Sequence, residues 1–322
     1  EKHFGIIKKQ FTQLIVFKII ITAGLLLIGG YLVISQQMNI GQFVAAEIII
    51  ILSINSVEKI IVGLETLYDV LTAVEKIGEI TDLKIEKESE IALDYCFTNI
   101  TLECENMNYK FPDSKSLVLE NINLKINPGD KILLNGKNGS GKSTLVRILS
   151  GLLQPTSGSL FINDDTYMKI NLQQYRSQIG TIIYGETPFE GTILENITFN
   201  NPNISQEDLK WAIDSVQLGK YIKSLPEGLD TKIHPEGQQL SSSNAQKILL
   251  ARNIISKPKI LFLEEPFDKM DTPIANEMID FITAKEHKWA LLITSKNPHW
   301  EQKCGRIITM SEGKINNEYK KL

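Results

Sequence analysis

The chain has 322 residues, enough for one large domain or two, with an ample core. Its formal net charge is −4 and its isoelectric point is about 5.7, so no basic surface indicates a nucleic-acid partner. The cysteines Cys96, Cys104 and Cys304 are unclustered and lack the spacing of a metal site, which is typical of reduced structural or surface thiols.

The first part of the chain is strongly apolar. Residues 14–34 contain a single charge, Lys18, and are about as long as a membrane-spanning helix. Residues 43–64 form a second apolar stretch, and a buried soluble hairpin is the alternative interpretation of the pair. Lysines flank this region, but none lies between residues 19 and 58, so both ends are expected in the cytoplasm and the connection at residues 35–41 outside.

The second stretch changes character along its length. Glu47 lies where an ionisable group is costly, and it faces either a bundle interior or substrate path, or lies near the outer interface. Residues 63–80 keep a helical spacing of apolar residues but add charges, as a helix emerging into the cytoplasm would. A charged linker follows at 81–94, and the short β-like runs and amphipathic helices of 95–322 predict an α/β domain.

Residues 131–149 are predicted to form a strand, a glycine-rich turn and a helix. Gly136 to Ser143 read GKNGSGKS and fit the phosphate-loop pattern G-x-x-x-x-G-K-[ST]. The glycines let backbone N–H groups surround phosphates, and the helix N-terminus adds its dipole. Lys142 is expected to reach the β- and γ-phosphates, and Ser143 to place its hydroxyl on Mg²⁺. The predicted ATP contacts of this loop are Gly136, Lys137, Asn138, Gly139, Ser140, Gly141, Lys142, Ser143 and Thr144.

A second predicted strand, within KILFLEEP at 259–266, ends in two carboxylates. Glu264 is expected to hold the Mg²⁺ shell, and Glu265 to orient or deprotonate the attacking water. Two acids after a strand are often only a solvated strand end, but the upstream phosphate loop favours a functional interpretation. Glu265 and Lys142 are therefore the predicted catalytic residues, and Ser143 and Glu264 the predicted metal ligands.

Together these segments resemble an ATP-binding cassette (ABC) transporter of the exporter type, over essentially the whole chain. Residues 1–80 are similar to the last two membrane helices of that family, at about 14–34 and 43–64, and residues 95–322 to its nucleotide-binding domain. The implied fold is an α/β P-loop NTPase preceded by transmembrane helices.

The resemblance also implies cofactors and partners. ATP and Mg²⁺ are the implied cofactors, and a second nucleotide-binding subunit, in a homo- or heterodimer, is the implied partner. Membrane lipid surrounds the helices, with the nucleotide domain in the cytoplasm and a bacterial inner membrane as the expected location. Because the chain begins with Glu1 and no signal-peptide pattern opens it, we expect an upstream part. The first helices loosely resemble bacterial peptide or toxin exporters with a preceding peptidase domain.

Two further segments match family motifs. MNYKFPD resembles the adenine-stacking segment, which places Phe111 against the base, with Tyr109 as the alternative. LSSSN at 240–244 stands at the signature position, where Ser241 would offer its hydroxyl to the ATP of the partner subunit. Ser242 and Ser243 add side chains where the family's glycines allow close backbone approach and positive φ.

Other positions depart from the family pattern. Tyr184 stands where the Q-loop glutamine is expected, and Ser295 where the switch histidine is expected. His299 is interpreted as a surface-loop histidine. The Walker B position holds Glu264 instead of aspartate, while Asp271 matches the D-loop aspartate.

We therefore expect a subunit that binds ATP and hydrolyses it slowly, coupled to export of an unidentified substrate. The alternative is a membrane-anchored ATP-binding pseudoenzyme that regulates or scaffolds a partner. Lys142, Glu265 and Asp271 favour the first hypothesis, whereas Tyr184, Ser295 and the LSSSN segment favour the second. A soluble chromosome-maintenance or repair ATPase of the same superfamily is a third possibility, against which the apolar stretches argue.

Overall fold

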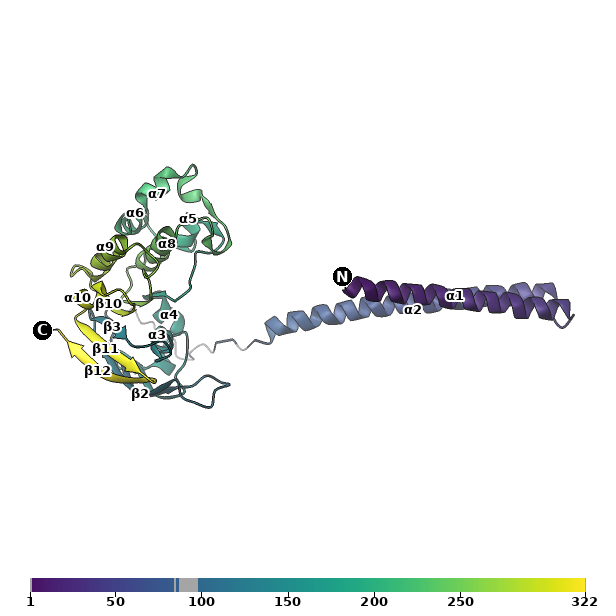
Figure 1. Cartoon of the computed structure of the whole chain (residues 1–322), viewed down its shortest axis with the longest axis horizontal. Coiled ribbons are helices and arrows are strands. Elements are labelled where there is room, and N and C mark those ends of the chain that lie inside the picture. The colour runs from purple at the N-terminus through teal and green to yellow at the C-terminus, as the bar shows by residue number, and fades with distance from the viewer. Residues whose placement is uncertain (1, 84, 87–97, 322) are drawn as a thin grey trace. The chain divides into compact units, whose positions relative to one another are not determined.

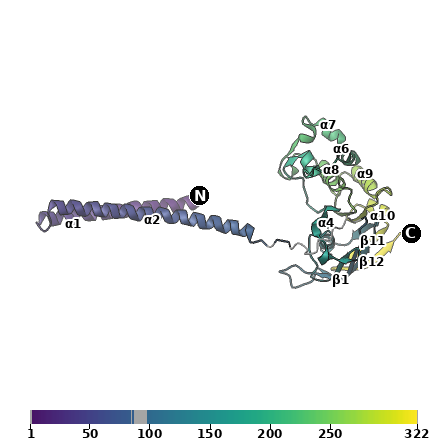
Figure 2. The ribbon, with the colours of Figure 1, turned by 180° about the vertical axis from the view of Figure 1, so that it is seen from behind.

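The computed structural model describes residues 2–83, 85–86 and 98–321, and the chain divides into two compact units, Glu1–Glu86 and Lys87–Leu322 (Figure 1). The first unit is a hairpin of two long helices, α1 (Lys2–Ile34) and α2 (Ile40–Thr81), which lie side by side in Figures 1 and 2. The turn is closed by Asn39, whose side chain accepts the Gln42 N–H in a capping box.

The apolar parts of the hairpin are long enough to cross a membrane. They span Thr12–Ile34 and Ile40–Ile60, with mean hydropathies of 2.2 and 1.8. The helices are longer than these spans, since α1 begins at Lys2 and α2 continues to Thr81. An ion pair joins them where Lys18 Nζ lies 2.5 Å from Glu58 Oε2.

The second unit is built on a six-stranded sheet in the order β12-β11-β3-β10-β9-β6. The strands from β11 to β6 are parallel, and β12 is antiparallel at the edge. Every residue of β9 and β10 is buried, as expected for parallel strands covered on both faces. The bounds are β3 (Lys131–Asn135), β6 (Ile179–Ile182), β9 (Ile260–Glu264), β10 (Ala290–Thr294), β11 (Arg306–Ser311) and β12 (Lys314–Lys320).

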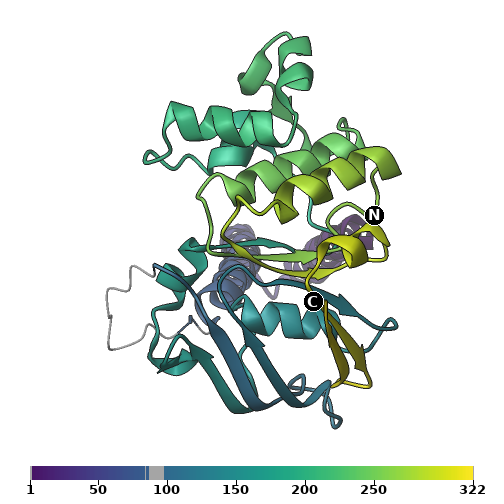
Figure 3. The same ribbon diagram turned by 90° about the vertical axis from the view of Figure 1, so that its left-hand side faces the viewer.

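A second, antiparallel sheet has the order β2-β1-β4-β5, and a short pair joins β7 to β8. The inner face of the four-stranded antiparallel sheet shares one apolar core with helix α3 and the main sheet, so α3 lies between these two sheets (Figure 3). The strands are β1 (Leu102–Tyr109), β2 (Leu119–Ile126), β4 (Ser157–Ile162), β5 (Asp165–Thr166), β7 (Gly191–Thr192) and β8 (Lys232–Ile233).

The opposite face of the main sheet is covered by helices α8 and α9, which share a second core with it (Figure 3). Cys104 and Cys304 are buried free thiols, one in each core, and Cys96 lies outside the described residues. The helices of this unit are α3 (Lys142–Leu149), α4 (Leu172–Ser177), α5 (Ile193–Thr198), α6 (Gln206–Ser215), α7 (Gly219–Ser224), α8 (Ser242–Ile254), α9 (Thr272–Thr283) and α10 (His299–Lys303).

Lys131, at the start of β3, makes the stability of this unit depend on pH. Its Nζ donates to the carbonyl oxygens of Trp289 at 2.6 Å and His287 at 3.3 Å, and burial lowers its pKa to about 8. Because this pKa lies below the ordinary 10.5, the unfolded chain binds more protons between those values, so the contribution of Lys131 to stability rises with pH.

We expect the free energy of unfolding of the unchanged chain to rise, relative to Lys131→Met, by on the order of 2 kcal/mol across that pH window. Denaturant unfolding can be followed by tryptophan fluorescence, since all 3 tryptophans lie in the second unit. If the free energies of unfolding of the unchanged chain and of Lys131→Met changed equally with pH, the lowered pKa would not belong to Lys131.

Candidate functional site

The carboxyl ends of the parallel strands bring the predicted site residues to one edge of the main sheet. The phosphate loop follows β3, Glu264 ends β9, Thr294 ends β10, and Tyr184 comes shortly after β6. A cavity of about 370 Å³ opens at this edge. It is lined by Val118, residues 138–144, Tyr184, Glu264, Glu265, Thr294 and Lys296. Ligands of open α/β sheets bind at such an edge.

The phosphate loop needs glycine at two positions for steric reasons. Gly136 has φ of 148°, and a Cβ there would lie 2.3 Å from the Met310 carbonyl oxygen. Gly141 has φ of 96°, and a Cβ there would lie 2.7 Å from Leu119 Cδ2. Gly141 is also the N-cap of α3, so the loop leads straight into a helix N-terminus, where backbone N–H groups favour an anion.

Lys142 is the first residue of α3 and its side chain turns back over the loop. Its Nζ donates to the carbonyl oxygens of Gly136 at 2.7 Å and Lys137 at 3.0 Å. Burial lowers its pKa, Glu265 acts in the opposite direction, and Lys296 lowers it further. A third, longer hydrogen bond goes to Ser140 Oγ at 3.4 Å, so all acceptors of this ammonium are neutral, and a phosphate could replace one of them with a stronger, anionic partner.

Glu264 has the properties of a cation ligand. Its side chain is 2% exposed, and Oε2 accepts the backbone N–H of Tyr184 at 3.0 Å. Its other oxygen, Oε1, is buried and has no hydrogen-bond partner among the described residues. Ser143 lines the same cavity. A hydroxyl and an unpaired carboxylate oxygen fit Mg²⁺, which is usually held by one or two protein oxygens together with phosphates and water.

Glu265 is held in a strained backbone conformation. Its φ is 44°, in the left-handed region, and its N–H donates to the Thr294 carbonyl oxygen at 2.7 Å. Such strain costs on the order of 1–3 kcal/mol and persists where the surrounding structure enforces it, often at functional sites. Here it places the carboxylate on the cavity wall, with Oε1 4.0 Å from Lys296 Nζ.

The two atypical residues, Tyr184 and Ser295, both lie at this edge. The Ser295 hydroxyl donates to Asp268 Oδ1 in a short hydrogen bond. Tyr184 is 59% exposed, and Lys269 Nζ lies 5.7 Å from the centre of its ring. Neither side chain presents the amide or imidazole that the family pattern has at these positions.

Tyr109 and Phe111, the two candidates for stacking on the base, are not among the residues that line the cavity, and they differ in burial. Tyr109 ends β1 and is 6% exposed, whereas Phe111 is 42% exposed and meets the Tyr109 ring edge-on at 5.2 Å. Only Phe111 of these two therefore offers a ring face to a base, and its stacking role stays a prediction.

The signature segment forms the N-terminus of α8. Ser241 is the N-cap, and its Oγ accepts the Asn244 N–H at 3.2 Å, which leaves its own O–H free to donate to a phosphate. Ser242 and Ser243 lie within the helix, so positive φ is not required there. Their cost is only the bulk of two side chains at the helix end.

Two other residues differ from their sequence interpretation. His299 is not a surface-loop residue, because it begins α10 and its Nε2 lies 2.7 Å from Asp280 Oδ1. Lys296 was missed, although it lines the cavity. Its position next to Ser295, directly after a buried strand, is the one sequence signal that points to it.

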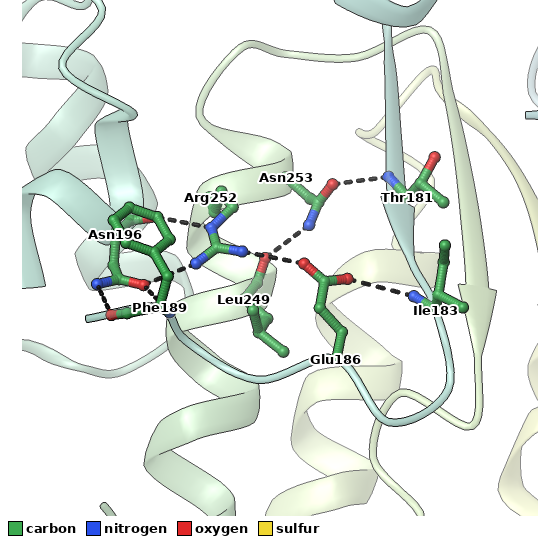
Figure 4. A network of polar contacts seen from close by, with 8 residues as sticks. All are labelled: Thr181, Ile183, Glu186, Phe189, Asn196, Leu249, Arg252 and Asn253. Carbon is green, nitrogen blue, oxygen red and sulfur yellow. Dashed lines mark hydrogen bonds and ion pairs between the residues drawn. The ribbon is translucent and has the colours of Figure 1, made fainter. Parts of the chain in front are cut away.

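Arg252 on α8 ties the signature helix to the segment that follows β6 (Figure 4). Its Nη1 lies 2.9 Å from Glu186 Oε1, and its Nε and Nη2 donate to the backbone and side-chain oxygens of Asn196 at 2.7 and 2.8 Å. The guanidinium also lies over the Phe189 ring, 5.3 Å from its centre. Next to it, Asn253 accepts the N–H of Thr181.

We expect Arg252→Met to lower the free energy of unfolding by about 3 kcal/mol, because it leaves the half-buried Glu186 carboxylate and the buried Asn196 without the guanidinium that binds both. Burial raises the pKa of Glu186, so its charge depends on this contact and on the Ile183 N–H. Denaturant unfolding by tryptophan fluorescence measures the change, with the exposed Lys223→Met as a matched control. If Arg252→Met lowered the free energy of unfolding no more than Lys223→Met does, the contacts of Arg252 with Glu186 and Asn196 would contribute little to stability.

The chain is similar in sequence and in fold to known transport proteins. A family model described as ABC transporter matches residues 119–268. The chain is 28% identical to the alpha-hemolysin translocation ATP-binding protein HlyB of Escherichia coli O157:H7, over 90% of this chain and 41% of that protein. It is 32% identical to the nisin transport ATP-binding protein NisT of Lactococcus lactis subsp. lactis, over 67% of this chain and 37% of that protein.

Among solved structures, the fold matches that of a bacterial Atm1-family ABC exporter with ATP bound. The TM-score is 0.72 at 20% sequence identity, and the match covers 79% of this chain and 45% of that one. The chain thus spans less than half the length of each of these proteins.

Proposed function

We propose that this chain is an exporter subunit that couples ATP binding and slow hydrolysis to transport. A family model described as ABC transporter matches residues 119–268, and two similar proteins are named for translocation and transport, which supports the proposal. The observation that carries the proposal is the cavity at the carboxyl edge of the main sheet. There the phosphate loop, the unpaired oxygen of Glu264 and the strained Glu265 line one space.

Each cavity residue has a chemical role in this proposal. The loop N–H groups and Lys142 bind the phosphates, and Ser143 and Glu264 hold Mg²⁺, which neutralises charge on the transferred phosphoryl group. Glu265 orients the attacking water and accepts its proton. Phe111 stacks on the base.

Slow hydrolysis is supported by the contacts of the two atypical residues. The Ser295 hydroxyl is bound to Asp268, and Tyr184 offers no amide to water or metal. Removing one positioned donor to a transition state typically costs a factor of about 10²–10³. The site therefore retains groups for binding and lacks groups for fast turnover.

The exposed N-terminus of α8 supports a proposal about the partner subunit. Ser241 is proposed to donate to the ATP of a second nucleotide-binding subunit, in a homo- or heterodimer. We propose that the two apolar helices, which are long enough to span a membrane, do so in a bacterial inner membrane, with the nucleotide domain in the cytoplasm. The exported substrate is unidentified.

Vanadate trapping and ATPase assays on the full chain in lipid–detergent micelles test this function. We expect Mg²⁺-dependent nucleotide trapping that Lys142→Ala abolishes, together with slow hydrolysis that Glu265→Gln abolishes. Nucleotide binding without any hydrolysis that depends on Glu265 would instead favour the regulatory pseudoenzyme. A failure to bind nucleotide would contradict both.

A further inference from the structure

Lys296 is a second cation at the nucleotide cavity, besides Lys142. It follows β10 after Ser295, and it lines both the cavity of about 370 Å³ and a neighbouring one of about 260 Å³. Both cavities are also lined by Lys142 and Glu265. The Lys296 ammonium lies 4.0 Å from Glu265 Oε1, and its side chain is 73% exposed, so it is free to change partners.

The backbone at Lys296 is fixed although its side chain is not. Asp268 accepts the Lys296 N–H through Oδ2 at 3.1 Å and the Ser295 hydroxyl through Oδ1. The Ser295 oxygen in turn accepts the Asn297 N–H at 3.1 Å. These hydrogen bonds hold the Ser295 side chain against Asp268, while the Lys296 side chain lines the cavity.

Two cations, Lys142 and Lys296, line the cavity and give an anionic ligand two charged partners. The two ammonium groups repel each other, and Lys296 lowers the pKa of Lys142. Of the two carboxylates in the cavity, Glu265 lies near both lysines, whereas Glu264 accepts the Tyr184 N–H and is the proposed Mg²⁺ ligand. A nucleoside triphosphate has one more phosphate than a diphosphate, and charge-assisted contacts to it are strong.

We propose that Lys296 binds the terminal phosphate of a nucleoside triphosphate and makes this cavity distinguish triphosphate from diphosphate. The inference rests on the proposed ATP site. On binding, Lys296 exchanges the Glu265 carboxylate for the phosphate, which releases Glu265 toward water. The chain thereby senses the third phosphate without a histidine at position 295.

Equilibrium binding on the full chain in lipid–detergent micelles tests the inference. The ligands are Mg²⁺ with ADP and Mg²⁺ with a non-hydrolysable ATP analogue that carries a β–γ imido bridge. We expect Lys296→Ala to weaken binding of the triphosphate by about 10-fold and of ADP by less than about 2-fold. Lys296→Arg should restore most of the preference for the triphosphate over ADP, and raised salt should reduce that preference. The exposed Lys285→Ala, with the same loss of charge, should leave both affinities unchanged.

The outcomes separate this inference from the proposed function. If both ligands bind and Lys296→Ala leaves their affinity ratio unchanged, or weakens both equally, the role of Lys296 is overturned while the ATP site stands. If the unchanged chain binds neither ligand, the ATP site fails and Lys296 has no phosphate to bind. Triphosphate-selective loss in Lys296→Ala with rescue by Lys296→Arg supports the inference.

Discussion

The double variant Tyr184→Gln/Ser295→His is expected to hydrolyse ATP about 10²–10³ times faster than the unchanged chain. Both positions lie at the carboxyl edge of the main sheet, one after β6 and the other directly after β10. The side chains introduced there would supply an amide and an imidazole near the Glu265 carboxylate. Tyr184 is exposed, so its replacement does not open the core.

Steady-state phosphate release by the full chain measures this effect. The matched control is Tyr184→Phe/Ser295→Ala, which alters the same positions without adding donors. Adding Glu265→Gln to the double variant should abolish the gain, because the same carboxylate must still act on water. A double variant no faster than its control would show that another feature, such as the LSSSN segment, limits turnover.

Glu264→Gln is expected to shift stability and nucleotide binding in opposite directions. The buried carboxylate has an oxygen without a described partner, so removing its charge should raise the free energy of unfolding without nucleotide by about 1–3 kcal/mol. The same change removes a charged ligand of Mg²⁺, so binding of the Mg²⁺–ATP analogue should weaken by about 10²-fold. The amide still offers an oxygen to the Tyr184 N–H.

Denaturant unfolding and equilibrium binding give the two readouts on the same preparation. Glu105→Gln, at an exposed position of β1, serves as a control for the loss of one carboxylate. Binding in EDTA should differ little between the unchanged chain and Glu264→Gln. A variant that is less stable and binds the Mg²⁺ complex equally well would show that Glu264 is structural.

The sequence predicted the parts of the site that are contiguous in the chain. The phosphate loop is a local pattern in which Gly136, Gly141 and Lys142 act through neighbouring backbone atoms. Glu264 and Glu265 were found because they end an apolar strand. The α/β fold followed from alternating strands and helices, and it is the observed fold of the second unit.

Contacts between distant segments were not predictable from local patterns. The partner of Ser295 is Asp268, on the loop after β9. The proposed role of Lys296 depends on the same aspartate, because its hydrogen bonds fix the backbone from which the Lys296 side chain extends. The helical backbone of Ser242 depends on where α8 begins, and the pairing of His299 with Asp280 needs α9 beside α10. Each of these is set by the packing of elements on the sheet.

The ion pair between Lys18 and Glu58 has a consequence for how the hairpin reaches the membrane. Lys18 lies near the start of the first apolar span and Glu58 near the end of the second, where a lone charge costs less to insert than at a helix centre, where the cost is about 2.5–3.5 kcal/mol. Inserted one at a time, the two helices would each carry an unpaired charge into lipid. In the proposed membrane location, the ion pair offsets both charges only when the two helices insert together, which favours insertion of the hairpin as one unit.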